Sequence, residues 1–357
     1  MKIIIAAGGT GGHLFPGIAL AEEFITKNET NRVLFIGTKR GMEKSILSRE
    51  GFNFEAIEAS GLKGKNPFNL LKSLILIPQS IFQSIMIIKR FNPDLVIGLG
   101  GYVSGPVVLA AYLMGIKTAI HEQNTLPGLA NRILGKIVHL IFVSFEYTLS
   151  RFPKGKTKMV GNPIRKQCLK GIVPSSSQPP FTLLVVGGSL GSHQINSAMI
   201  DALNYLLPIR DKIKIIHQTG ESDLGSVKES YQSKGFPAEV VNFIDQIASA
   251  YQQANLIICR AGATTLAELM VHHRASILIP YPLAADHHQH LNAKALVSQR
   301  AAQMIDPDQL TGKRLAELVL QLYHHPEQLS QMESNAGKMG KPGAAQEIVD
   351  YCYKLIA

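Results

Sequence analysis

The sequence has no tryptophan and only three cysteines. Cys168, Cys259 and Cys352 are widely spaced and form neither a Cys-x-x-Cys pair nor a Cys/His ligand pattern. A disulfide framework is therefore excluded, and a reducing compartment is expected.

Long hydrophobic runs are also missing. The first apolar run ends at Gly8 after five residues, which is too short for the core of a signal peptide. The longest candidate span, Ser73–Ile88, has sixteen uncharged residues but includes Pro78 and several polar side chains. A membrane span needs about 20 mostly apolar residues. We therefore expect a cytoplasmic protein whose contact with a membrane is peripheral.

What is present indicates two folded domains with a basic surface. The chain has 357 residues, of which 46% are hydrophobic, and domains usually hold about 100–200 residues. The charge balance of 36 − 26 = +10 attracts an anionic partner such as nucleic acid, an acidic membrane or a phosphorylated substrate. Nucleic acid has the least support, because aromatic residues are 7% of the chain and no arginine-rich tract occurs.

A repeat gives the architecture. An apolar run followed by a Gly-Gly turn occurs at Gly8-Gly9 and again at Gly187-Gly188, 179 residues later. Each turn carries a hydroxyl residue and leads into a helical pattern. Buried strands bounded by glycine and followed by helices are typical of parallel α/β sheets. The repeat predicts twin Rossmann-like domains.

Further elements fit this plan in both halves. Helical spacing occurs at 17–26 and 263–272, and a closing helix is expected at 344–355, with no sheet partner that the pattern identifies. The expected strands are 3–7, 32–37, 94–98, 118–121, 183–186, 212–217, 256–259 and 276–280. The expected domain limits are 1–160 and 181–340, with a turn-rich linker at 161–180 and the C-terminal helix within 341–357.

Two glycine-containing loops are candidate phosphate sites. The loop from Gly8 to His13 follows a strand and opens a helix, where backbone N–H groups can meet a phosphate. Tight packing of strand against helix is the alternative. The loop is not Gly-x-Gly-x-x-Gly, and no Gly-x-x-x-x-Gly-Lys-Ser/Thr motif occurs, so nicotinamide cofactors and P-loop phosphoryl transfer lose support.

The segment from Arg260 to Glu268 is the second candidate. Its small residues leave bare N–H groups at a helix start, which suits a diphosphate. Glu268 comes about one turn later, where a carboxylate can accept hydrogen bonds from ribose hydroxyls. The alternative is an acid at the helix start that complements the helix dipole.

Two acidic or histidine-rich segments could suggest a metal, but we expect none. His287 and His290 could share one helix face, yet a polar loop that recognises sugar hydroxyls is the preferred interpretation. Asp306-Pro307-Asp308 is the only Asp-x-Asp in the chain. It precedes an expected helix at 309–322, so helix capping with a proline in the first turn explains it.

The apolar block Ser73–Ile88 has a basic border, and two interpretations stay open. It is either a pair of core helices broken by Pro78 or a surface patch that dips into an anionic bilayer. The patch would include Lys72, Ile75 and Phe82. The basic residues around it are Lys63, Lys65, Lys72, Lys89 and Arg90.

An ordered set of motifs then carries a resemblance over nearly the whole chain. The motifs are Gly8-Gly9-Thr10-Gly11-Gly12-His13, Phe15-Pro16-Gly17, Gly100 to Pro106, His121-Glu122-Gln123-Asn124, Gly161 to Arg165, Gly187-Gly188-Ser189 and Arg260 to Glu268. Together they resemble the MurG family, bacterial transferases that add N-acetylglucosamine to the lipid-linked muramoyl-pentapeptide precursor of peptidoglycan.

This resemblance implies a GT-B fold, two Rossmann-like parallel-sheet domains facing a cleft, with UDP-N-acetylglucosamine (UDP-GlcNAc) as donor and neither a cofactor nor a metal. It implies that the diphosphate, uracil, ribose and sugar are bound mainly by the C-terminal half. Leu190 stands where the family commonly has Gln, so only backbone contacts are implied there. The implied donor-binding residues are Thr10, Gly11, Gly12, Asn124, Arg165, Ser189, Ile244, Ala263, Thr264, Thr265, Leu266, Ala267, Glu268 and Gln289.

The implied reaction inverts the anomeric centre in one displacement, so the 4-hydroxyl of the muramoyl acceptor needs a base. His13 is the first candidate, because an imidazole titrates near neutrality, and Glu122 is the second. Arg165 and the helix start after Gly262 would stabilise the charge on the departing UDP.

The resemblance places the enzyme peripherally at the cytoplasmic face of the inner membrane, in peptidoglycan synthesis and hence in cell shape and division. Its implied partners are UDP-GlcNAc, the undecaprenyl-linked acceptor and an anionic membrane, without nucleic acid. Another GT-B enzyme, either a glycolipid glycosyltransferase or a UDP-GlcNAc 2-epimerase, is the alternative.

Overall fold

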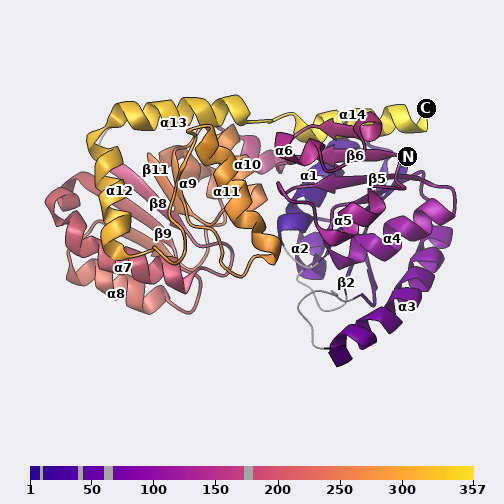
Figure 1. The fold of residues 1–357 in the computed structure, drawn as a ribbon, viewed down its shortest axis with the longest axis horizontal. Helices are drawn as coiled ribbons and strands as arrows, with labels where there is room; N and C mark the ends of the chain where they lie inside the picture. Colours follow the sequence, from indigo (N-terminus) through magenta and orange to yellow (C-terminus); the bar gives the residue numbers. More distant parts are fainter. Residues whose placement is uncertain (9–10, 39–42, 60–66, 173–179) are drawn as a thin grey trace. The chain divides into compact units, whose positions relative to one another are not determined.

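The chain folds into two compact α/β units. The computed structural model describes residues 1–8, 11–38, 43–59, 67–172 and 180–357, with the side chains of 67–75 left aside. Met1–Lys166 and Pro342–Ala357 form one unit, here the N-unit, and Gln167–Lys341 form the other, the C-unit. Both chain ends lie in the N-unit (Figure 1).

The N-unit is built on one parallel sheet. In the described residues its seven strands have the order β3-β2-β1-β4-β5-β6-β7. The order reverses between β1 and β4, so the loops that follow these two strands leave the sheet in opposite directions. The strands are β1 Lys2–Ala6, β2 Arg32–Thr38, β3 Asn53–Ile57, β4 Leu95–Gly98, β5 Lys117–Glu122, β6 Leu140–Val143 and β7 Thr157–Met159.

Helices cover both faces of this sheet. Ile3 and Ile5 pack in one apolar cluster, whereas Ile4 and Ala6 pack in another, because successive side chains of a strand point to opposite faces. Both faces of the sheet are buried, which explains why β1 is an uninterrupted apolar run. The helices are α1 Gly11–Lys27, α2 Glu43–Arg49, α3 Pro67–Phe91, α4 Gly101–Leu113, α5 Leu129–Leu134, α6 Glu146–Leu149 and α14 Ala344–Ile356, with a 3₁₀ turn η1 Lys154–Lys156.

The closing helix is confirmed as α14, and it completes the core of the N-unit. Ile348, Val349 and Cys352 are buried in the same cluster as Phe24 of α1. At the helix surface, Asp350 pairs with Lys27 at 2.7 Å. The last segment of the chain therefore packs against the first sheet rather than the second.

The C-unit repeats the plan with six parallel strands in the described residues, in the order β10-β9-β8-β11-β12-β13. The order reverses between β8 and β11. Its strands are β8 Phe181–Val186, β9 Ile213–Gln218, β10 Ala238–Val241, β11 Leu256–Cys259, β12 Ser276–Leu278 and β13 Gln303–Met304. Its helices are η2 Lys166–Leu169 at the unit boundary, α7 His193–Leu206, η3 Leu207–Lys212, α8 Leu224–Ser233, α9 Ile247–Gln253, α10 Ala263–Val271, η4 Ala285–His287, α11 His288–Ser298, α12 Gly312–His324 and α13 Pro326–Met339.

The eight expected strands and the twin Rossmann-like architecture are confirmed. The five strands that the sequence did not reveal are short or partly exposed, namely β3, β6, β7, β10 and β13. The expected linker, 161–180, extends into residues outside the described part and stays a prediction.

Two local expectations are wrong. Pro78 does not separate two helices, because α3 continues through it from Pro67 to Phe91. Asp306 and Asp308 do not cap a helix: α12 begins only at Gly312, and the Thr311 hydroxyl accepts the Arg314 N–H at 3.1 Å as its N-cap. Thr311, three residues after Asp308, caps the helix instead, so Pro307 does not lie in its first turn.

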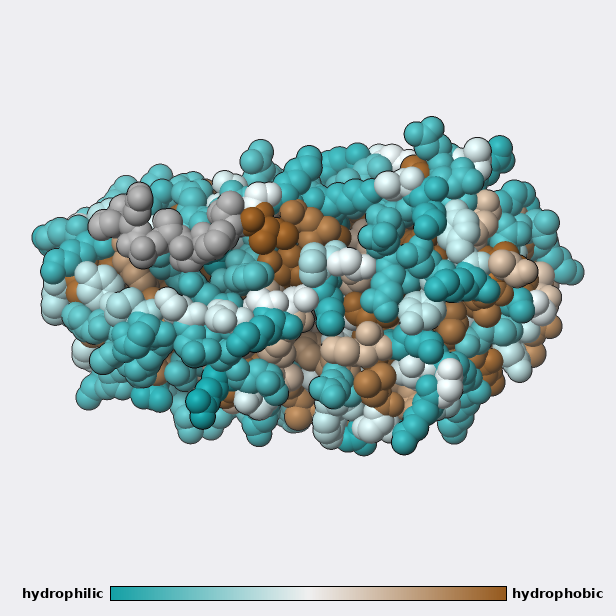
Figure 2. Space-filling view, turned by 90° about the horizontal axis from the view of Figure 1, so that it is seen from above, coloured by the Kyte–Doolittle hydropathy of each residue, from teal (hydrophilic) through white to brown (hydrophobic). Residues whose placement is uncertain are grey.

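Among the described helices, none is long and apolar enough to cross a membrane. The face drawn in Figure 2 is largely hydrophilic, with hydrophobic residues in smaller groups among the polar ones.

Candidate active site

In the N-unit, candidate residues gather where β1, β4 and β5 end, at the reversal of strand order. His13 is the third residue of α1 and lies against the loop that starts α4. A Cβ atom on Gly100 would lie 3.1 Å from His13 Nε2, and Gly100 and Gly101 have φ values of 93° and 72°. Only glycine provides this backbone and this space, so the Gly-Gly pair seats the imidazole.

Glu122, the last residue of β5, is a buried carboxylate that four N–H donors surround. Oε1 accepts the backbone and side-chain N–H groups of Asn124 at 3.0 and 3.3 Å. Oε2 accepts Gly128 N–H at 3.0 Å and the Asn131 amide at 2.8 Å. Burial raises the pKa of Glu122, while these hydrogen bonds oppose the rise. The carboxylate thus holds the loop after β5 and faces no solvent.

The residues on either side of Glu122 connect this part of the chain to other loops of the N-unit. The buried Gln123 amide donates to Leu99 O at 2.8 Å, which ties the loop after β5 to the loop after β4. His121 Nε2 lies 2.9 Å from Gly161 O, and burial lowers the pKa of this histidine to about 4. The sequence marked Gln123 only as part of a motif, and nothing in the pattern marked Asn131.

Arg165 belongs to the N-unit by its contacts. Its guanidinium lies over the Phe15 ring of α1, 4.2 Å from the ring centre, which is within the range of a cation–π interaction. Gly11 and Gly12 are the first residues of α1, while Thr10 lies outside the described residues.

In the C-unit, the second glycine loop joins β8 to α7. The Ser192 hydroxyl caps α7 by accepting Ile195 N–H, and Ser189 and Leu190 are exposed at the tip of the loop. Leu190 is 84% exposed, which leaves its side chain without a packing role.

Arg260, directly after β11, links three loops of the C-unit. One nitrogen donates to the Ser192 hydroxyl at 2.7 Å, and the other to the carbonyls of Ile279 and Pro280 at 3.2 and 2.9 Å. Its guanidinium also lies 5.5 Å from the centre of the Tyr281 ring. The sequence placed Arg260 in a motif but did not predict that it links these loops, because its hydrogen-bond acceptors are distant in the chain.

Helix α10 starts beside Arg260 with Gly262 as its N-cap, a residue with no side chain to accept the first N–H groups. The N–H groups of this first turn point to the N-terminal end of the helix. Leu266 and Ala267 are buried and pack the helix against its unit, and the Leu266 N–H donates to Gly262 O at 2.9 Å.

Glu268 is the sixth residue of α10 and is nearly buried. The Tyr251 hydroxyl donates to its Oε2 at 2.9 Å, and burial together with the charge of Glu268 raises the pKa of Tyr251 well above its usual value. The proposed alternative, an acid in the first turn that complements the dipole, is wrong, because Glu268 lies beyond that turn.

Two further donor candidates already make local contacts. Gln289 accepts Tyr281 N–H at 2.9 Å, and Ile244 N–H donates to Gln218 Oε1 at 2.9 Å. The Ile244 N–H group is therefore already engaged within the C-unit. Sequence analysis missed Gln218.

The histidine-rich segment does not assemble a metal site. His287 has a left-handed φ of 52° and precedes α11. The possibility that His287 and His290 share one helix face is therefore wrong. His290 Nδ1 lies 3.0 Å from Asp306 Oδ1, so the first acid of the Asp-x-Asp motif pairs with this histidine. In the part of the chain that the structure describes, no group of three His, Cys, Asp or Glu residues could hold a metal ion.

The membrane candidates lie on α3. Phe82 is 64% exposed, and Ile77 and Met86 are also exposed. Lys72 and Ile75 fall in the part of α3 whose side chains lie outside the described residues.

Two Rossmann-like units, each with a glycine loop at the reversal of strand order, define the GT-B fold. Residues 3–143 match the glycosyltransferase family 28 N-terminal domain, and residues 182–348 match the family 28 C-terminal domain. The chain belongs to glycosyltransferase family 28 and, within it, to the MurG group that its motifs resemble.

Relatives and solved structures agree with this assignment. The UDP-N-acetylglucosamine–N-acetylmuramyl-(pentapeptide) pyrophosphoryl-undecaprenol N-acetylglucosamine transferase of Myxococcus xanthus is 51% identical over 357 residues, covering 100% of this chain and 93% of the relative. The transferase of the same name from Geotalea daltonii is 48% identical, covering 98% and 96%. The crystal structure of Acinetobacter baumannii MurG is 30% identical with a TM-score of 0.79, covering 99% and 100%. A UDP-GlcNAc 2-epimerase from Neisseria meningitidis has a TM-score of 0.68 at 15% identity, covering 99% and 100%, which shows a shared fold alone.

Proposed function

We propose that this enzyme transfers N-acetylglucosamine from UDP-GlcNAc to the 4-hydroxyl of the muramoyl unit of undecaprenyl-pyrophosphoryl-MurNAc-pentapeptide, as a step of peptidoglycan synthesis. The observation that carries the proposal is the 51% identity, over the whole chain, to a transferase named for this reaction. One feature of each unit supports it: the C-unit has a glycine-capped helix start, which suits an anion, and the N-unit has a seated imidazole.

The C-unit is the proposed donor site. The N–H groups at the start of α10 and the backbone at Ser189 would receive the diphosphate, and Glu268 would receive the ribose. Gln289 and Asn124 would contact the sugar, with Thr10, Gly11 and Gly12 near it. Arg165 would add a positive charge for the departing UDP, in place of a cation.

The N-unit supplies the proposed base. His13 is half-buried at a helix start, whereas Glu122 is buried with both oxygens occupied by N–H donors. A base must reach the hydroxyl proton and then release it, which favours His13. Glu122 would act through the loop 123–128, which it positions.

We further propose that the enzyme works at the cytoplasmic face of the inner membrane through the outer side of α3. Helices α3, α4 and α5 pack in succession, and each exposes large apolar side chains. The sequence pointed to α3 as a candidate, but it did not point to the exposed Leu113 on α4 or to Leu129 and Ile133 on α5. Apolar burial joined to the basic residues Lys89 and Arg90 suits an anionic bilayer.

The direct test is turnover of UDP-GlcNAc with and without the undecaprenyl-linked acceptor. We expect UDP release only with acceptor, and a lipid product that has gained one N-acetylglucosamine in a β linkage. Formation of an epimerised sugar nucleotide without acceptor would instead assign the 2-epimerase function.

The same assay in excess EDTA tests the expectation that no metal takes part. Asp306 is paired with His290, and in the proposed site Arg165 and a helix start would meet the phosphate charge. We expect unchanged turnover. A loss that Mg²⁺ or Mn²⁺ reverses would contradict this part of the proposal.

A further inference from the structure

A single buried glutamine joins two loops of the C-unit. Gln218 is the last residue of β9, the strand between β8 and β10, and it is paired in register with Val186 on one side and Val241 on the other. Its side chain is 3% exposed. The glycine loop follows β8, and the segment that contains Ile244 follows β10.

The two ends of the Gln218 amide serve different loops. Nε2 donates to Gly188 O at 2.7 Å, and Oε1 accepts Ile244 N–H at 2.9 Å. The Gly188 carbonyl also accepts Gly191 N–H at 2.9 Å, which closes the turn at the tip of the loop. Because one end must donate and the other accept, only an amide of this length makes both bonds.

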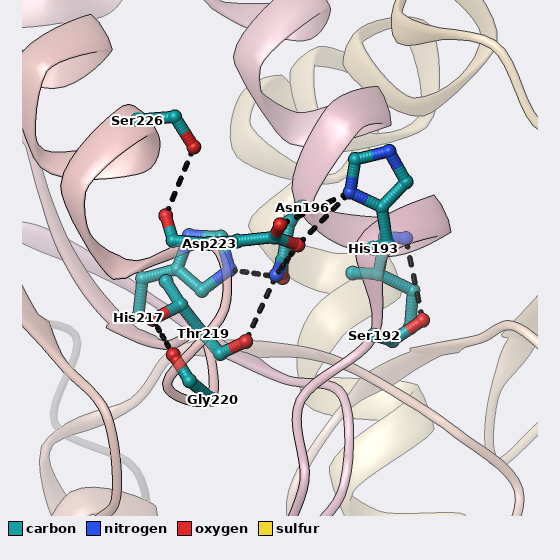
Figure 3. A network of polar contacts seen from close by, with 9 residues as sticks. Ser192, His193, Asn196, His217, Thr219, Gly220, Asp223 and Ser226 are labelled. Carbon is teal, nitrogen blue, oxygen red and sulfur yellow. Dashed lines mark hydrogen bonds and ion pairs between the residues drawn. The ribbon is translucent and has the colours of Figure 1, made fainter.

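The loop that follows Gln218 is itself fixed. Gly191 and Gly220 have φ values of 76° and 75°, and a Cβ on Gly191 would lie 1.8 Å from Thr219 O, so the two backbones touch. Asn196 of α7 donates to Thr219 O at 2.9 Å and to Asp223 at 2.8 Å, which places it at the centre of the network (Figure 3).

His217 completes this frame. Its ring nitrogens lie 3.0 Å from Asn196 Oδ1 and 2.8 Å from the Tyr231 hydroxyl. The end of β9 is therefore held rigidly by hydrogen bonds, and the Gln218 side chain extends from it to both neighbouring loops.

We propose that Gln218 is a positioning residue that sets the distance between the diphosphate loop, 187–191, and the base-binding segment at Ile244. The inference rests on the proposed donor site. A uridine diphosphate must engage both loops at once, whereas uridine alone engages one. Fixing the two loops relative to each other thus favours the nucleoside diphosphate over its fragments.

Two variants separate the two arms. Gln218→Met has a similar volume and loses both bonds, while Gln218→Glu keeps the acceptor for Ile244 N–H and loses the donor to Gly188 O. Gln232→Met, at an exposed position on α8, is the matched control. Isothermal titration with UDP and with uridine, together with donor KM and kcat, gives the readout, and thermal unfolding verifies the fold.

For Gln218→Met we expect the Kd for UDP and the donor KM to rise about tenfold, with kcat at saturating donor and the Kd for uridine within about twofold. For Gln218→Glu we expect uridine binding to be kept and UDP binding to weaken. The control should match the parent enzyme.

Equal weakening of UDP and uridine, or unchanged UDP binding, would overturn the inference. If Gln218→Met does not fold, the isosteric Gln218→Glu decides by the same comparison. A parent enzyme that binds neither UDP nor UDP-GlcNAc would instead reject the proposed function, so the two failures are distinguishable.

Discussion

The Asn131 amide on α5 donates a 2.8 Å hydrogen bond to the buried carboxylate of Glu122 at the end of β5. With the bonds from Asn124 and Gly128, it places the acid in the centre of the loop that carries the sugar-site candidate Asn124. A carboxylate with both oxygens occupied is suited to organising a loop. This relationship separates the two candidate bases, which the sequence alone could only rank.

The first prediction concerns these bases. His13→Ala should lower kcat about 10²–10⁴-fold with little change in donor KM, because general-base assistance to the 4-hydroxyl is lost. Asn131→Ala should change both kcat and KM, since it loosens the loop that Glu122 holds. Steady-state kinetics with saturating acceptor measures both. A His13→Ala variant with full kcat would return the role to Glu122.

The second prediction concerns Glu268. Glu268→Ala should raise the KM for UDP-GlcNAc about tenfold or more, because hydrogen bonds to a charged group contribute about 1.5–3 kcal/mol. Tyr251→Phe is the matched control, since it removes the hydroxyl bound to the same carboxylate but no ribose contact. Titration of UDP checks both variants. Unchanged affinity in a folded Glu268→Ala protein would reject the ribose assignment.

The third prediction concerns the membrane. Phe82→Glu together with Met86→Glu should reduce binding to anionic vesicles by about tenfold or more, because two exposed apolar side chains of α3 become charged. The parent protein should dissociate partly as salt rises, since screening weakens its basic contacts. Leu207→Glu, an exposed apolar position in the C-unit, is the control.

Vesicle sedimentation measures this binding, and titration of UDP verifies that the donor site survives. A double variant that sediments like the parent protein would mean that α3 does not face the membrane.

The fourth prediction concerns acid stability. Burial lowers the pKa of His121 to about 4 and of His217 to about 3, whereas a histidine in the unfolded chain titrates near 6.5. Between these values the unfolded chain binds protons that the folded chain does not, so stability is full above about pH 6.5 and falls as the pH drops. At pH 5 each histidine should cost about 2 kcal/mol of unfolding free energy.

Denaturant unfolding at pH 7.5 and pH 5 measures this loss, and His121→Asn should reduce it for the N-unit. Equal unfolding free energies at both pH values would show that these imidazoles take up protons in the folded protein as readily as in the unfolded chain.

Several features could be read from the sequence because they depend on neighbours along the chain. The strands around Ile4 and Leu184 are continuous apolar runs, and the glycines that follow them permit backbone that other residues disfavour. The same reasoning was wrong at Pro78 and Asp306. Helix α3 continues through Pro78, and Thr311 rather than Asp306 caps α12.

The sequence by itself determined the twin Rossmann-like architecture, the family and most candidate residues, because local periodicity and motif order are properties of the chain. Only the tertiary structure decided that α14 closes the N-unit, that Glu122 is held by Asn131, and that Gln218 joins two loops. These contacts depend on which strands become neighbours in a sheet. Hydrogen bonds between residues far apart in sequence leave no periodic pattern, so folding alone brings their partners together.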